Sequence, residues 1–211
     1  MESGSQTEAK RRTLTDWAKH ASKGILEPLA RLLLKLGLEP NFLSFIGFLL
    51  AVAAGSLSAV GRFPQSGCVF LLSGIIDALD GTLARIGRLE SRFGAFFDSF
   101  LDRYSESALF LGIAYWSTFE ARHDLVLLAI LSLVGSYMVS YARARAEGVG
   151  ISCRIGLFSR MERFIILVLA LLSGQLFLGL VFLAIMANVT AFQRLVHVAR
   201  QSRREQDLIK G

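Results

Sequence analysis

The sequence predicts an all-α integral membrane protein with six transmembrane helices, preceded by an N-terminal amphipathic helix at the membrane interface. Hydrophobic residues make up 53% of the 211 residues and charged residues only 19%, against roughly 45–50% and 25% in soluble domains. The apolar residues gather into blocks of about 20, the length that a helix needs to cross a hydrocarbon core. The basic residues, which give a net charge of +6, flank these blocks. Membrane lipids with anionic head groups are therefore the expected partners, and nucleic acid is not.

The N-terminal part of the chain divides into two expected segments. Residues 1–12 are polar and are predicted to be a disordered tail. Residues 13–38 place Trp17, Leu29 and Leu36 among apolar residues at helical spacing, with basic residues between them. A helix of this pattern directly before a long apolar block is typical of a juxtamembrane helix that lies along the membrane surface.

The remaining chain predicts one membrane domain over residues 39–200 and a charged C-terminal tail over residues 201–211. The expected spans cover residues 42–61, 65–86, 93–118, 124–146, 161–174 and 177–199. Arg62 and Arg122 are the basic residues on the side reached after the odd-numbered spans, and all other Lys and Arg fall on the opposite side. The positive-inside rule then places both termini in the cytoplasm, in a multi-pass protein of the cell (inner) membrane.

Five carboxylates fall where a membrane protein seldom tolerates them. Asp77 and Asp80 end the second expected span, Asp98 and Asp102 begin the third, and Glu106 lies one turn deeper. Residues three or four apart share one helix face, so a short antiparallel connection would make the four aspartates converge. Because such a cluster repels itself, it is expected to hold cations, protons or basic partners, and oxygen ligands favour hard divalent cations. For Glu106 the sequence leaves two roles open, orienting a metal ligand or pairing with an arginine.

The segment between the aspartate pairs favours a phosphate-bearing substrate. Gly81 follows an acid directly and permits close approach of a ligand, and Arg85 can bind phosphate through two hydrogen bonds. An alternative is a hydrated helical turn whose acids pair with nearby arginines and whose glycines allow close helix packing. A cation transporter or channel that uses the same acids is a further alternative. It is disfavoured because the acids lie at one membrane face instead of midway across.

The order and spacing of eight residues resemble the motif of the CDP-alcohol phosphatidyltransferase family. The matching residues are Asp77, Asp80, Gly81, Ala84, Arg85, Gly94, Asp98 and Asp102. The resemblance extends to the preceding interfacial helix, to Pro40-Asn41 at the entrance of the first span and to the six-helix arrangement. It implies a cytoplasmic-side active site and a homodimer.

The resemblance also implies roles for these residues. Asp77, Asp80, Asp98 and Asp102 would hold one or two Mg²⁺ or Mn²⁺ ions, and Asp102 would also act as the general base. The residues implied to contact the CDP group are Asp77, Asp80, Gly81, Ala84 and Arg85.

A second set of residues resembles the phosphatidylinositol-phosphate synthase branch of this family. These residues are Ser140–Gly148, Arg160–Arg163 and Gln193-Arg194. The resemblance implies a pocket for the acceptor phosphate that is formed by Arg143, Arg160 and Arg194, with Arg145 and Arg163 as further candidates. The chain departs from the branch in having Arg143 where Lys is frequent and Met161 where Pro is frequent, and the positive-inside rule alone would also place arginines here.

The resulting prediction is an enzyme that transfers a phosphatidyl group from CDP-diacylglycerol to a phosphorylated polyol and releases CMP. A phosphorylated acceptor is expected, because several fixed cations bind a phosphate dianion but offer little to a neutral or zwitterionic alcohol. The resemblance to the phosphatidylinositol-phosphate synthase branch implies that this acceptor is inositol phosphate. Glycerol 3-phosphate remains an alternative acceptor.

Overall fold

The described part of the protein is built from α-helices. The structure is a computed structural model that describes residues 14–153 and 155–210, and it contains no strand within these ranges. The helices are α1 (Leu14–Lys35), α2 (Pro40–Ala59), α3 (Phe63–Gly87), α4 (Arg92–Phe119), α5 (His123–Gly148), α6 (Arg160–Ser173) and α7 (Leu176–Lys210). The all-α class is therefore confirmed, whereas the predicted tail over residues 1–12 lies outside the described residues.

The helix ends follow local sequence rules. Pro40 occupies the first turn of α2, where its missing N–H costs no hydrogen bond. Arg88 ends α3 in the left-handed conformation (φ 54°), and the Ser91 hydroxyl caps α4 by accepting a hydrogen bond from the Gly94 N–H at 2.9 Å. At the other end of the chain, α7 continues to Lys210. The segment expected as a charged tail is thus helical almost to its end, because it contains helix-favouring Arg, Gln, Glu, Leu and Lys, lacks Pro and contains no Gly before residue 211.

Within the described residues, four helices are long and apolar enough to cross a membrane: α2, α3, α5 and residues Leu176–Arg204 of α7. Two of the six helices expected to do so do not meet this description. Helix α6 has 14 residues and is about 21 Å long, and α4 carries several charged residues in its first half. Many large apolar side chains on the four long helices are exposed, including Leu127 and Leu178. The chain is therefore a membrane protein.

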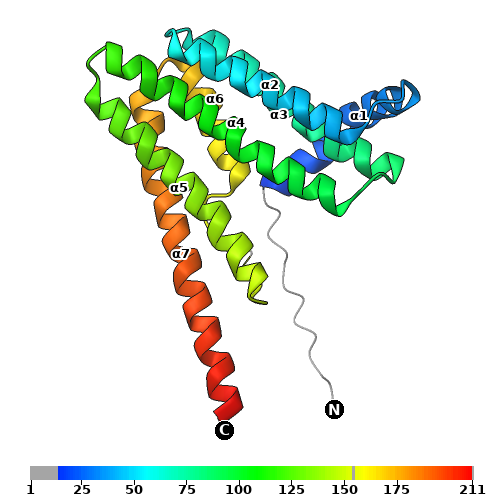
Figure 1. The fold of residues 1–211 in the computed structure, drawn as a ribbon, viewed down its shortest axis with the longest axis vertical. Helices are drawn as coiled ribbons and strands as arrows, with labels where there is room; N and C mark the ends of the chain where they lie inside the picture. The colour runs from blue at the N-terminus through cyan, green and yellow to red at the C-terminus, as the bar shows by residue number, and fades with distance from the viewer. Residues whose placement is uncertain (1–13, 154, 211) are drawn as a thin grey trace.

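The helices pack so that α2 lies against both α3 and α4, α5 lies against α4 and α7, and α6 lies against α3 and α7 (Figure 1). Helices α2 and α4 cross closely at Gly55 and Gly112, where an added methyl group on either residue would overlap the other helix's backbone. Helix α1 packs on α3, with Ala30 fully buried near Leu79 and Leu83. This packing leaves the acid-bearing parts of α3 and α4 facing a shared interior space.

Candidate active site

In the described part of the chain, several charged and hydroxyl-bearing residues of the helices line a large cavity. Its volume is about 970 Å³, and it is lined by residues from α2 to α7. The acids on its wall include Asp77, Asp98, Asp102 and Glu106, and the arginines are Arg103, Arg143, Arg160, Arg163 and Arg194. The cavity therefore combines, within a largely apolar protein, oxygen donors for a cation and cations for an anionic group.

Three of the four predicted aspartates converge. Asp77 of α3 and Asp98 and Asp102 of α4 each place one carboxylate oxygen within 4.8 Å of the other two. The Asp102 side chain is 7% exposed and that of Asp77 is 31% exposed. Three negative charges this close repel one another, so the cluster is stabilised by a cation. Its oxygen donors fit a hard divalent ion such as Mg²⁺ or Mn²⁺.

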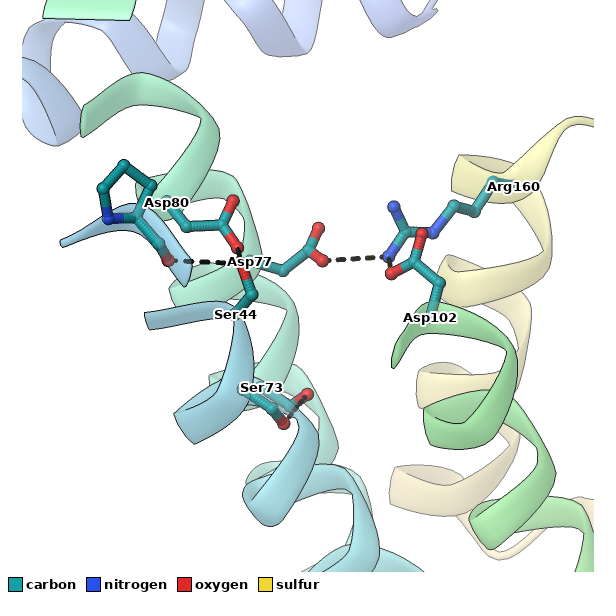
Figure 2. A network of polar contacts seen from close by, with 8 residues as sticks. Ser44, Ser73, Asp77, Asp80, Asp102 and Arg160 are labelled. Carbon is teal, nitrogen blue, oxygen red and sulfur yellow. Dashed lines mark hydrogen bonds and ion pairs between the residues drawn. The ribbon is translucent and has the colours of Figure 1, made fainter. Parts of the chain in front are cut away.

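The fourth aspartate, Asp80, faces α2 instead. It is buried, and the hydroxyl of Ser44 lies 2.5 Å from its Oδ2 and 3.2 Å from the carbonyl oxygen of Pro40 (Figure 2). One hydroxyl has one proton, and the shorter contact to a charged acceptor indicates that Ser44 donates it to Asp80. Below this contact, the hydroxyl of Ser73 donates to the carbonyl oxygen of Gly47 at 2.8 Å. Helices α2 and α3 are thus joined by hydrogen bonds at the height of the aspartates.

Arg160 reaches the carboxylate cluster from a distant part of the sequence. Its Nη2 donates to Asp77 Oδ1 at 3.0 Å and also to Asp102 Oδ1, so one nitrogen bridges α3 and α4 (Figure 2). The position of Arg160 is set by the start of α6, where Ser159 and Glu162 form a capping box. Asp98 completes the group of acids around this guanidinium.

Glu106 pairs with an arginine, one of the two roles that the sequence left open. Arg163 donates from Nε to Glu106 Oε1 at 3.2 Å, and the two side chains are 2% and 14% exposed. The Arg163 Nη1 has no hydrogen-bond partner among the described residues. The structure therefore holds a second charge pair on the cavity wall, deeper along α4 than the aspartates.

The other arginines predicted to bind a phosphate differ in their surroundings. Arg143 is exposed and pairs with Glu147 at 2.9 Å, whereas Arg194 is buried and donates to the backbone carbonyls of Ile155 and Val139. Arg145 is exposed and is not among the residues that line the cavity. The cavity thus unites Arg143, Arg160, Arg163 and Arg194 from three helices and excludes Arg145.

The residues predicted to contact CDP beyond Asp77 lie further along α3. Asp80, Gly81, Ala84 and Arg85 do not line the cavity. The exposed Arg85 folds back along the helix and donates from Nη2 to the Thr82 hydroxyl at 3.1 Å. A methyl group on Gly81 would meet only the guanidinium of Arg85. The surface over Gly81 is therefore open to a ligand if Arg85 turns aside.

Sequence reasoning did not find Ser44 as a site residue. Its one local signal is a hydroxyl within an apolar span, one turn after Pro40. Its partner is 36 residues away, so the pairing depends on how α2 and α3 cross. The pairing of Arg163 with Glu106 could not be predicted from local sequence patterns either, since the two residues are 57 positions apart.

The fold and the cavity define an all-α membrane protein whose site joins clustered carboxylates to arginines. The model of the CDP-alcohol phosphatidyltransferase family matches residues 38–195. The chain therefore belongs to the CDP-alcohol phosphatidyltransferase family and is an enzyme of that class.

Individual relatives agree with this assignment. The chain is 37% identical over 177 residues to the archaetidylinositol phosphate synthase of Pyrococcus horikoshii, covering 83% of this chain and 92% of the relative. It also resembles crystal structures of the Mycobacterium tuberculosis phosphatidylinositol phosphate synthase. The structure of that relative with CDP-DAG bound superimposes with a TM-score of 0.78 at 34% identity, over 82% of this chain and 93% of that chain. For the structure of the same relative with manganese and citrate, the TM-score is 0.77 at 33% identity, over 82% of this chain and 88% of that chain.

Proposed function

We propose that the enzyme transfers a phosphatidyl group from CDP-diacylglycerol to inositol phosphate, forming phosphatidylinositol phosphate and releasing CMP. The observation that carries the proposal is a single cavity in which three carboxylates suited to a divalent cation lie beside several arginines suited to a phosphate. The names of the relatives from Pyrococcus and Mycobacterium support inositol phosphate as the acceptor.

The aspartates are proposed to hold Mg²⁺ or Mn²⁺. Asp77, Asp98 and Asp102 supply the clustered oxygens, and Asp80 is included because it belongs to the family motif. When bound, the metal polarises the pyrophosphate of the donor and stabilises the departing CMP. The manganese-containing structure of the Mycobacterium tuberculosis relative supports this choice of ion.

Asp102 is proposed as the general base. Its carboxylate is the most buried of the three and lies on the cavity wall, where it can accept the proton of the acceptor hydroxyl. The CDP group is proposed to lie along the end of α3, near Asp77 and Asp80. The proposed contacts further along this helix are Gly81, Ala84 and Arg85.

The acceptor phosphate is proposed to bind the arginines. Arg143, Arg160, Arg163 and Arg194 line the cavity, and charge-assisted hydrogen bonds from guanidinium groups suit a phosphate dianion. Arg145 would contribute from the rim, since its side chain is exposed. Free inositol or serine offers these groups no comparable anion.

The proposed setting is the cytoplasmic face of the cell (inner) membrane, with all six helices α2 to α7 spanning the bilayer and α1 lying at its surface. The distribution of Lys and Arg along the chain supports this orientation. The short α6 and the charged first half of α4 would be accommodated by burial against their neighbours. The family resemblance supports a homodimer.

The testing experiment measures CMP release by the purified protein from CDP-diacylglycerol with Mg²⁺ or Mn²⁺. Inositol phosphate, glycerol 3-phosphate, free inositol and serine are compared as acceptors. We expect stimulation by inositol phosphate and loss of activity with a chelator. Asp98→Asn should also abolish release, while Asp207→Asn, on the exposed end of α7, should not.

The outcomes separate the parts of the proposal. Stimulation by glycerol 3-phosphate alone would replace the acceptor and keep the chemistry. Cation flux into vesicles without CMP release under any condition would favour the transporter alternative and overturn the proposal.

A further inference from the structure

Arg160 occupies carboxylate oxygens that the same site needs for a metal. Its Nη2 contacts Oδ1 of Asp77 and Oδ1 of Asp102, and these are two of the three acids in the carboxylate cluster. An oxygen lone pair that accepts a guanidinium hydrogen bond is not at the same time available to a metal ion. A guanidinium and a dication on the same carboxylates also repel each other.

Arg160 differs from the neighbouring buried arginines in its freedom to change partners. Its side chain is 50% exposed, whereas that of Arg163 is almost fully buried against Glu106. Arg194 is held by two backbone carbonyls. The capping box of Ser159 and Glu162 fixes where α6 begins, so the backbone of Arg160 stays in place while its side chain can turn within the cavity. The pair with Asp77 is exposed, and an exposed ion pair is weak and is broken at little cost. The pair with Asp102 is partly buried, and only its guanidinium is open to water.

We propose that Arg160 is an exchangeable counterion that couples the binding of the metal to the binding of the acceptor phosphate. The guanidinium neutralises Asp77 and Asp102 until a divalent cation takes these oxygens, and it then becomes available to a phosphate in the same cavity. The inference rests on the proposed function, because it assigns both the cation and the phosphate to this site.

Thermodynamic linkage gives the exchange a measurable form. If metal binding frees Arg160 for a phosphate, then the metal tightens phosphate binding, and the phosphate must tighten metal binding by the same factor. Removing the guanidinium of Arg160 should therefore change both the affinity for the metal and its dependence on phosphate. Metal binding without substrate becomes tighter because a competitor is lost, and the link between metal and phosphate weakens. An arginine that only binds phosphate would leave metal affinity unchanged.

The experiment titrates the full-length protein with Mn²⁺ in detergent micelles and follows free Mn²⁺ by electron paramagnetic resonance, with no nucleotide present. For Arg160→Gln we expect Mn²⁺ affinity to rise about three- to tenfold, as suits the loss of two ion pairs of which one has a buried carboxylate. Arg160→Lys should stay near the parent protein because it keeps the charge. Arg92→Gln is the matched control, since it removes the same charge from the exposed start of α4 and should leave affinity unchanged.

A second titration adds inositol 1-phosphate at a fixed concentration. We expect it to raise Mn²⁺ affinity in the parent protein and to do so much less in Arg160→Gln. Unchanged or weaker Mn²⁺ binding by Arg160→Gln, with Arg160→Lys behaving like the parent, would overturn the exchange. If Arg160→Gln binds Mn²⁺ more tightly but inositol 1-phosphate affects neither protein, the metal competition stands. The proposed acceptor site is then the part that fails.

Discussion

The buried pair of Arg163 and Glu106 allows a quantitative test that does not depend on catalysis. Replacing Glu106 with Met removes the carboxylate that faces the Arg163 Nε at 3.2 Å. The guanidinium, 2% exposed, then keeps its charge without a counterion. Its Nη1 already has no hydrogen-bond partner among the residues that the structure describes, so the remaining structure offers little compensation.

The expected cost follows from this burial. Removing one partner of a buried ion pair costs about 3–5 kcal/mol. We take the lower end of this range for Glu106→Met, because Glu106 is 14% exposed and water reaches that side of the pair. For a chain of this size, about 3 kcal/mol corresponds to a fall of about 6–12 °C in the thermal midpoint. Arg163→Met should cost less, because a carboxylate on the cavity wall can be hydrated.

The assay is thermal unfolding of the detergent-solubilised protein, followed by tryptophan fluorescence at one detergent concentration. The double variant with Met at both positions should regain most of the loss, because it removes the uncompensated charge. A fall of less than about 1 kcal/mol for Glu106→Met would refute the reasoning, since an exposed pair costs no more than that. Additive effects of the two single variants would refute it as well.

Three further changes test the site and its framework. Ser44→Ala should weaken Mn²⁺ binding about tenfold, measured by electron paramagnetic resonance, because the carboxylate of Asp80 loses the hydroxyl that orients it. Asp102→Asn should abolish CMP release but retain binding of CDP-diacylglycerol, since the amide cannot take a proton from the acceptor. Gly112→Ala should destabilise the protein by about 1–3 kcal/mol, measured by thermal unfolding, because its methyl group would overlap the backbone at Gly55.

Matched variants give each test its control. Ser56→Ala removes an exposed hydroxyl of α2 that bonds within its own helix and should leave Mn²⁺ binding unchanged, whereas Ser44→Thr should keep most of it. Gly148→Ala meets no atom within 4 Å and should not lower the thermal midpoint. Equal loss of CDP-lipid binding and turnover in Asp102→Asn would deny that residue the role of base. Unchanged Mn²⁺ binding in Ser44→Ala would remove the orienting role of that hydroxyl.

The helices were predictable because their signals are local. Blocks of apolar residues, the proline at the start of α2 and the hydroxyl cap at Ser91 act within a few residues. The residue ranges of the six expected spans agree with helices α2 to α7, although four of these helices are long and apolar enough to cross a membrane. Helix α7 continues beyond the last expected span and includes most of the segment predicted as a charged tail. Charged residues in succession suggest solvation, but they do not by themselves end a helix.

The residue types of the site were also readable from the sequence. Acids three and four residues apart at the ends of apolar blocks must share helix faces, and the spacing of the motif from Asp77 to Asp102 is by itself enough to indicate the family. The sequence predicted that all four aspartates converge through the short antiparallel connection of the two helices. In the structure Asp77, Asp98 and Asp102 do so, whereas Asp80 contacts Ser44.

The pairing of these groups was decided only by the tertiary structure. Asp80 turns to Ser44, Arg160 meets Asp77 across 83 residues of sequence, and Glu106 finds Arg163. Helical periodicity fixes which residues share a face of one helix, but it contains no information on how two helices cross. The choice of counterion depends on that crossing, because charge interactions in the cavity are strong only between groups within a few ångströms of each other.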